Sequence, residues 1–112
     1  MQDRTAQQRR RLDAHVFVCT QTREEHSSCA AAYGDETLEA VKEWLRDRNA
    51  FWSPIGVTET DCLGLCSEGG TALTIQPHDV WYSDVKPTEV PEILTAAFGP
   101  EAADTASPTA IQ

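Results

Sequence analysis

The sequence of 112 residues predicts a small α/β domain with elements in the order strand, helix, strand, strand, strand, helix. Two observations support this fold class. Segments rich in Val, Ile, Phe and Thr are typical of strands, and the last two of these segments are separated by a short turn. Two other stretches repeat apolar residues at the spacing of an amphipathic helix. At this length the chain forms one domain at most.

Four segments are predicted to be strands. The first covers residues 14–20 and ends beside Cys19, and the second covers residues 55–60. Residues 71–76 alternate between apolar and polar side chains, as a half-buried strand does. The sequence Pro-His-Asp at 77–79 predicts a turn, so a return strand that begins at Val80 would form a hairpin with the third.

Two amphipathic helices are predicted. Asp35 is a candidate N-cap for the first helix, which we expect to end near Asn49. Pro87 is suited to open the second helix, because the first helical position needs no N–H donor. Apolar residues line one face of each helix: Leu38, Val41, Trp44 and Leu45 in the first, and Val90, Ile93, Leu94, Ala97 and Phe98 in the second.

The two ends of the chain differ from this core. Residues 1–13 are rich in Gln and Arg and lack an apolar stripe, which predicts a flexible N-terminal arm. Residues 100–112 are mostly Ala, Thr, Ser and Pro, which predicts a disordered tail, so the folded domain is expected to cover residues 14–99. No segment resembles a signal peptide or a membrane span, and we therefore expect a cytoplasmic protein.

The charge balance limits the possible partners. Asp and Glu number 18 against 9 Lys and Arg, which gives a formal net charge of −9. Such a chain would be repelled by nucleic acid, and it favours a partner with a basic surface. The sequence offers no nucleophile with a nearby base, no phosphate-binding loop and no pair of carboxylates in a supporting context. We therefore expect that the protein has no enzyme activity of its own.

Four cysteines are the strongest functional signal, and we interpret them as one ligand set: Cys19, Cys29, Cys62 and Cys66. Three residues separate the last pair, including Gly64, whose lack of a Cβ lets a short loop fold tightly around an inorganic centre. Thiols stay reduced in the cytosol, which disfavours a disulfide framework. Thioredoxin-type dithiol exchange is also disfavoured, because no Cys-x2-Cys motif is present.

Spacing and composition leave two rival centres. Structural zinc sites use two short Cys knuckles, whereas nine residues separate the first two cysteines here. An iron–sulfur cluster accepts loops of unequal length, although the spacing differs from that of plant-type ferredoxins. On this basis a [2Fe-2S] cluster is only modestly favoured over zinc.

A resemblance to a known family shifts this balance toward the cluster. Four segments carry it: Val-Phe-Val-Cys-Thr at 16–20, Ser-Ser-Cys at 27–29, Asp-Cys-Leu-Gly-Leu-Cys-Ser-Glu-Gly at 61–69, and Val-Trp-Tyr-Ser-Asp-Val-Lys-Pro at 80–87. Over residues 14–98 the sequence resembles the thioredoxin-like [2Fe-2S] ferredoxins, in which such segments follow one another in this order. The chain has Leu65 where the family often has proline and Lys86 where it has threonine, and neither is a ligand position.

The resemblance implies a thioredoxin-like mixed central sheet with helices packed on it, and one [2Fe-2S] cluster per chain. Carried over to this chain, Cys19 and Cys29 would hold one iron, and Cys62 and Cys66 the other. The implied function is one-electron transfer to redox partner proteins by a homodimer. Trp81 is a candidate for the dimer contact, although a core position is the commoner place for a tryptophan. A zinc-stabilised interaction module and a cluster-bearing accessory protein for redox sensing or cofactor assembly remain alternatives.

Overall fold

The computed structural model describes residues 1–20, 34–60, 63–64 and 70–102. The predicted element order is confirmed, with one helix added before the first strand. The strands are β1 (Ala14–Cys19), β2 (Ile55–Thr60), β3 (Thr71–Gln76) and β4 (Val80–Val85). The helices are α1 (Thr5–Arg11), α2 (Gly34–Asp47) and α3 (Val90–Phe98), and a 3₁₀ turn, η1 (Pro87–Glu89), precedes α3.

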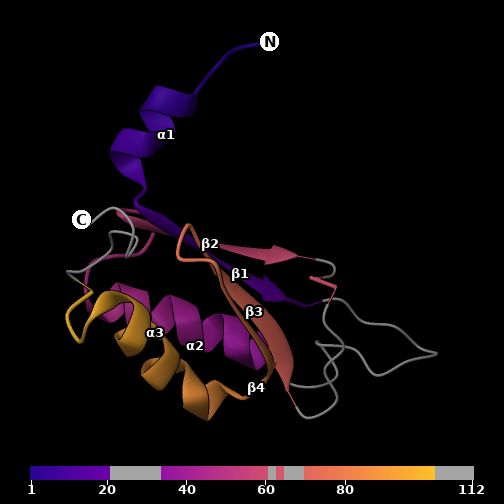
Figure 1. The fold of residues 1–112 in the computed structure, drawn as a ribbon. Coiled ribbons are helices and arrows are strands. Elements are labelled where there is room, and N and C mark those ends of the chain that lie inside the picture. The colour runs from indigo at the N-terminus through magenta and orange to yellow at the C-terminus, as the bar shows by residue number, and fades with distance from the viewer. Residues whose placement is uncertain (21–33, 61–62, 65–69, 103–112) are drawn as a thin grey trace.

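The four strands form one mixed sheet in the order β2-β1-β3-β4 (Figure 1). β1 lies in the centre, parallel to β2 and antiparallel to β3, while β3 and β4 form the predicted hairpin. Parallel neighbours need a crossover connection, and α2 lies in the connection between β1 and β2. The mixed sheet that the family resemblance implied is therefore confirmed.

Helix α2 ends two residues before the predicted Asn49, and its C-terminal cap explains why. Asn49 has a φ of 57°, in the left-handed region that asparagine tolerates better than most residues. The N–H of Asn49 donates to the carbonyl of Arg46, and the N–H of Ala50 donates to that of Leu45. This pair of hydrogen bonds is a Schellman motif, which closes the helix and turns the chain toward β2.

The second predicted helix is divided into two parts. Pro87 opens η1 rather than an α-helix, and α3 begins only at Val90. The carboxylate of Glu89 accepts the backbone N–H of Lys86 at 2.9 Å, which satisfies a donor at the start of this turn. Pro91 lies in the first turn of α3, where its missing N–H leaves no intrahelical bond broken.

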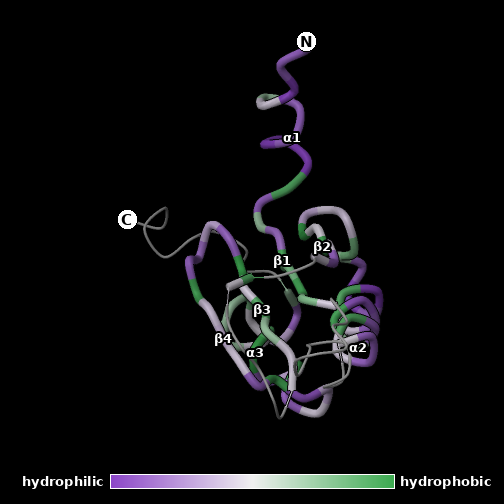
Figure 2. The backbone as a smooth tube through the Cα atoms, turned by 90° about the vertical axis from the view of Figure 1, so that its right-hand side faces the viewer, coloured by the Kyte–Doolittle hydropathy of each residue, from purple (hydrophilic) through white to green (hydrophobic). Residues whose placement is uncertain are grey.

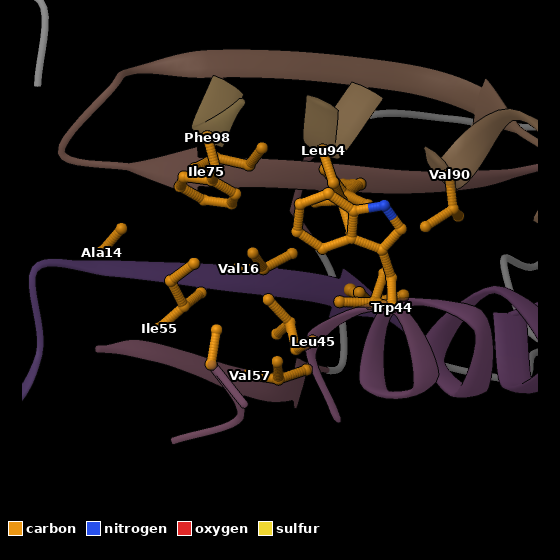
Figure 3. Close-up of a cluster of buried hydrophobic side chains, with 14 of the residues drawn as sticks. Ala14, Val16, Trp44, Leu45, Ile55, Val57, Ile75, Val90, Leu94 and Phe98 are labelled. Atoms are coloured by element: carbon orange, nitrogen blue, oxygen red, sulfur yellow. The ribbon is translucent and has the colours of Figure 1, made fainter. Parts of the chain in front are cut away.

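The hydrophobic core lies between the sheet and the two helices α2 and α3. Alternate residues of β1 point to opposite faces, so Val16 and Val18 face the helices and are fully buried. Figure 3 shows Trp44 from α2 and Leu94 from α3 pointing into this layer. The predicted apolar faces of the helices are thus the buried ones, except that Ile93 and Ala97 are only partly buried.

The opposite face of β1 carries an aromatic cluster near its first residues. The His15 ring stacks on Phe17 with centroids 4.5 Å apart and meets the edge of Trp52 at 5.3 Å. A Cβ on Gly56 would lie 2.6 Å from the His15 ring, so glycine at this position lets the imidazole lie close against β2. The ring also hydrogen-bonds the hydroxyl of Thr58.

Helix α1 forms an exposed basic projection from the sheet. None of its residues is buried, and Figure 2 shows it mostly in the colour of hydrophilic residues. Arg11 fixes its base, because the guanidinium donates to the carbonyl of Trp52 at 3.3 Å and lies 5.9 Å from the centre of that ring. That the arm is flexible stays a prediction. At the other end Ala102 packs in the core, and residues 103–112 lie outside the described part of the chain.

The three tryptophans occupy different environments. Trp44 is buried as expected, whereas Trp52 is half-buried in the aromatic cluster. A core position for Trp81 is wrong: its side chain is 51% exposed on the edge strand β4, and its indole N–H donates to the carboxylate of Asp79 at 2.9 Å. Trp81 pairs with Thr74, which points away from the helices, and it lies on an edge strand in which residues 81–84 are all exposed.

Replacing Phe98 with Ala should destabilise the fold by about 3–5 kcal/mol, because it removes a fully buried ring and leaves a cavity. The measurement is the free energy of unfolding from urea titration. Thr95→Ala, an exposed position on the same helix, is the control and should change it by less than about 0.5 kcal/mol. Equal losses from the two variants would contradict the placement of Phe98 in the core.

Stability should fall in mild acid through His15. Burial lowers the pKa of His15 below its ordinary value of about 6.5, so the unfolded chain takes up a proton before the folded protein does. The contribution of the neutral imidazole is complete above about pH 6.5 and is lost as the pH falls through the lower pKa of the folded state.

The free energy of unfolding should therefore drop more steeply between about pH 7.5 and 5 in the wild type than in His15→Gln. The remaining histidines and carboxylates are common to both proteins and cancel in the comparison. Parallel pH profiles would contradict the role given to His15.

Candidate metal centre

Cys19 is the one predicted ligand that lies within the described residues. It is the last residue of β1 and is only 2% exposed. By strand alternation its side chain lies on the same face as Phe17, away from the helix-covered core. It forms a small separate apolar cluster with Ala72 of β3, against which Leu63 packs.

Two neighbouring strands fix the backbone of Cys19. It pairs with Thr60 in the parallel ladder, and the N–H of Thr20 donates to the carbonyl of Thr60 at 3.0 Å. From the other side, the buried hydroxyl of Thr71 donates to the carbonyl of Cys19 at 2.6 Å. The strand end is therefore held by hydrogen bonds to both neighbours.

The predicted ligands Cys29, Cys62 and Cys66 lie outside the described residues. Two described residues near Cys62 are nevertheless close to Cys19. Thr60 precedes Cys62 by two residues, and Leu63 follows it directly. Both are neighbours of Cys19, one through strand pairing and one through side-chain packing. The described residues on either side of Cys62 therefore both lie beside Cys19.

Two glycines flank the segment that carries Cys66. Gly64 has a φ of 80°, a left-handed conformation that favours glycine, which agrees with the tight turn expected from the sequence. A Cβ on Gly70 would collide with the backbone of Asp84 and Val85 in β4. Glycine is needed at this position because β4 passes directly against the start of β3, where the ladder register shifts between Thr71 and Leu73.

Within the described ranges, no group of three or more His, Cys, Asp or Glu side chains is arranged to hold a metal ion. The chemistry of the available donor fits an iron–sulfur centre, because a thiol is a soft ligand and Cys19 lies in a small apolar environment away from the main core. A sulfur atom buried in this way would be shielded from solvent, although Cys19 lies at the end of the sheet.

Sequence reasoning missed the residues that surround Cys19. The role of Thr71 depends on the antiparallel register of β1 and β3, and a local pattern carries no information about which residues face each other. The alternation of side chains along β3 could have identified Ala72, because Ala72 must lie on the face of the sheet opposite to that of the core-facing Leu73. One carboxylate also lies near the strand end, since Glu59 accepts a hydrogen bond from the hydroxyl of Thr20, the residue after Cys19, at 3.0 Å.

No helix in the described part of the chain has the length and apolar character needed to cross a membrane. No protein-family model matches the sequence. Curated relatives do match, and two of them are ferredoxins: a "Ferredoxin, 2Fe-2S" of Clostridium pasteurianum is 32% identical over 82 residues, and one of Aquifex aeolicus is 34% identical over 83 residues. Each alignment covers 71% of this chain, and 79% and 74% of the respective relatives.

A solved structure agrees with the sequence comparison. The wild-type thioredoxin-like [2Fe-2S] ferredoxin from Aquifex aeolicus superimposes with a TM-score of 0.67 at 28% identity. The match covers 87% of this chain and 92% of the other. The described fold, with its mixed sheet and cysteine at the end of β1, therefore comes with sequence similarity along most of the domain. From this agreement the chain belongs to the thioredoxin-like [2Fe-2S] ferredoxins.

Proposed function

We propose that this ferredoxin carries single electrons on one [2Fe-2S] cluster held by Cys19, Cys29, Cys62 and Cys66. The first two thiolates would bind one iron and the last two the other. The observation that supports this ligand set most directly is the position of Cys19, a buried thiol at a strand end beside Thr60 and Leu63, which lie on either side of Cys62.

The residues around Cys19 would hold the thiolate in a fixed position. Hydrogen bonds with both neighbouring strands keep the backbone of Cys19 and Thr20 in place, so the sulfur would change position little when the cluster changes charge. When bound, a [2Fe-2S] cluster accepts one electron and becomes more negative by one charge. Nearby carboxylates would lower the reduction potential, and backbone N–H groups directed at sulfur would raise it.

The same proposal extends to the partners, the compartment and the oligomeric state of the protein. With a net charge of −9 it would meet redox partners through their basic surfaces rather than bind nucleic acid. We place it in the cytoplasm, where its thiols stay reduced until the cluster is assembled. It would work as a homodimer, for which the exposed Trp81 is a candidate contact, and it would catalyse no bond chemistry by itself.

The absorption spectrum tests the cofactor directly. Anaerobically purified protein should be red-brown, should contain about two irons and two acid-labile sulfides per chain, and should be partly bleached by dithionite. Iron, sulfide and zinc should be assayed on the same sample. A colourless protein with about one zinc would contradict the electron-carrier function and support a zinc-stabilised binding module.

Replacing Cys19 with Ala should abolish the cluster, because three thiolates cannot complete two four-coordinate irons. The iron and sulfide contents and the visible absorbance should fall to near background. Thr20→Ala is the matched control: it removes only the exposed hydrogen bond to Glu59 and should retain the full iron content. Normal iron and sulfide contents in Cys19→Ala would exclude Cys19 as a ligand.

A further inference from the structure

A groove with an acidic rim runs between the edge strand β4 and helix α3, which lie beside each other in Figure 1. Its volume is about 310 Å³. We define the acidic groove by three carboxylates and three residues with apolar surface: Asp84, Glu89 and Glu92, with Tyr82, Val85 and Ile93. Among the residues that the structure describes, neither lysine nor arginine lines it.

The groove combines two kinds of surface. Val85 is buried at its base and Ile93 is partly buried, whereas all three carboxylate residues are exposed to solvent. Tyr82 is 36% exposed, one of three large hydrophobic residues with exposed side chains in the described part of the chain. Apolar surface bordered by negative charge suits lysine and arginine side chains, whose stems pack on apolar groups while their charged ends stay near carboxylates.

The position of the groove links it to Cys19. Val85 pairs with Thr71 across β3 and β4, and the hydroxyl of Thr71 donates to the Cys19 carbonyl at 2.6 Å. Asp84 and Val85 also pass directly against Gly70. Only β3 separates β4 from β1, so the backbones of β1 and β4 lie about 10 Å apart at this end of the sheet.

We propose that the acidic groove is the docking site for a basic segment of the redox partner, with lysine or arginine side chains seated between β4 and α3. This inference rests on the proposed electron-carrier function. A second copy of the chain is a poorer occupant, because a two-fold contact through the groove would set its three carboxylates against the same three of the partner subunit. A basic segment bound here would lie beside the end of the sheet that carries Cys19.

The test uses cytochrome c, a basic haem protein, as the electron acceptor. The holoprotein is reduced, excess reductant is removed, and the second-order rate of cytochrome reduction is followed by stopped flow. The groove variant is Asp84→Asn/Glu89→Gln/Glu92→Gln, in which asparagine tolerates the left-handed φ of 56° at position 84. Gln at position 89 keeps an acceptor for the Lys86 N–H.

The matched control is Glu43→Gln/Asp47→Asn/Glu101→Gln. It removes the same three charges from exposed positions near the C-terminal ends of α2 and α3, away from Cys19. At about 0.01 M ionic strength the groove variant should reduce cytochrome c about tenfold more slowly than the control. The difference should shrink at about 0.1 M, where the Debye length is about 10 Å.

Equal rates in the two variants would overturn the proposal, because net charge alone would then explain the attraction. A change of oligomeric state in the groove variant by sedimentation velocity would assign the groove to a second copy and also overturn it. Should the triple variant not fold, the exposed single variant Glu92→Lys is compared with Glu43→Lys by the same criterion. Failure of the electron-carrier function would be seen separately, as a wild type that has no cluster or reduces neither cytochrome c nor ferricyanide.

Discussion

The register of β1 between its two neighbours is the constraint on which the rest of the structure depends. In this register Val16 and Val18 face the helices, and Cys19 meets Thr60 on one side. A slip of β1 by one residue would reverse its faces, exposing the valines and moving Cys19 toward the helix-covered layer. The hydrophobic core therefore also determines on which face of the sheet the thiol of Cys19 lies.

Hydrogen bonds add to the constraint that the hydrophobic core places on Cys19. The Thr71 hydroxyl is fully buried and has the Cys19 carbonyl as its acceptor, so an apolar residue at position 71 would leave that carbonyl without this donor. Gly70 serves the same end of the sheet in a different way, because only a residue without a Cβ lets β4 approach so closely. Fixed geometry around Cys19 thus comes from residues that are not themselves candidate ligands.

Much of the fold could be predicted from the sequence, because it depends on local patterns. The strand-like composition of 55–60 and 71–76 matches β2 and β3 residue for residue. The predictions were less accurate where conformation depends on a cap or on a partner strand. The Schellman motif at Asn49 ended α2 early, and Trp81 is exposed because β4 is an edge strand.

The candidate site could likewise be predicted only in part from the sequence. Residue type alone singled out Cys19 and Gly64, and the structure puts Cys19 at the strand end that was expected. The contact of Cys19 with Thr71 joins residues 52 positions apart in the sequence, which no local pattern encodes. The ligand roles of Cys29, Cys62 and Cys66 stay predictions, because these residues lie outside the described ranges.

The location of α1 has a consequence for attaching the molecule to a surface. Three consecutive arginines, Arg9, Arg10 and Arg11, end a fully exposed helix that leads into the first residue of β1, whereas Cys19 is the last residue of that strand. A negatively charged electrode would attract the helix and hold the cysteine end toward the solution. A positively charged electrode would attract the acidic body instead. The sign of the charge on the electrode would therefore select which end of the sheet faces the electrode.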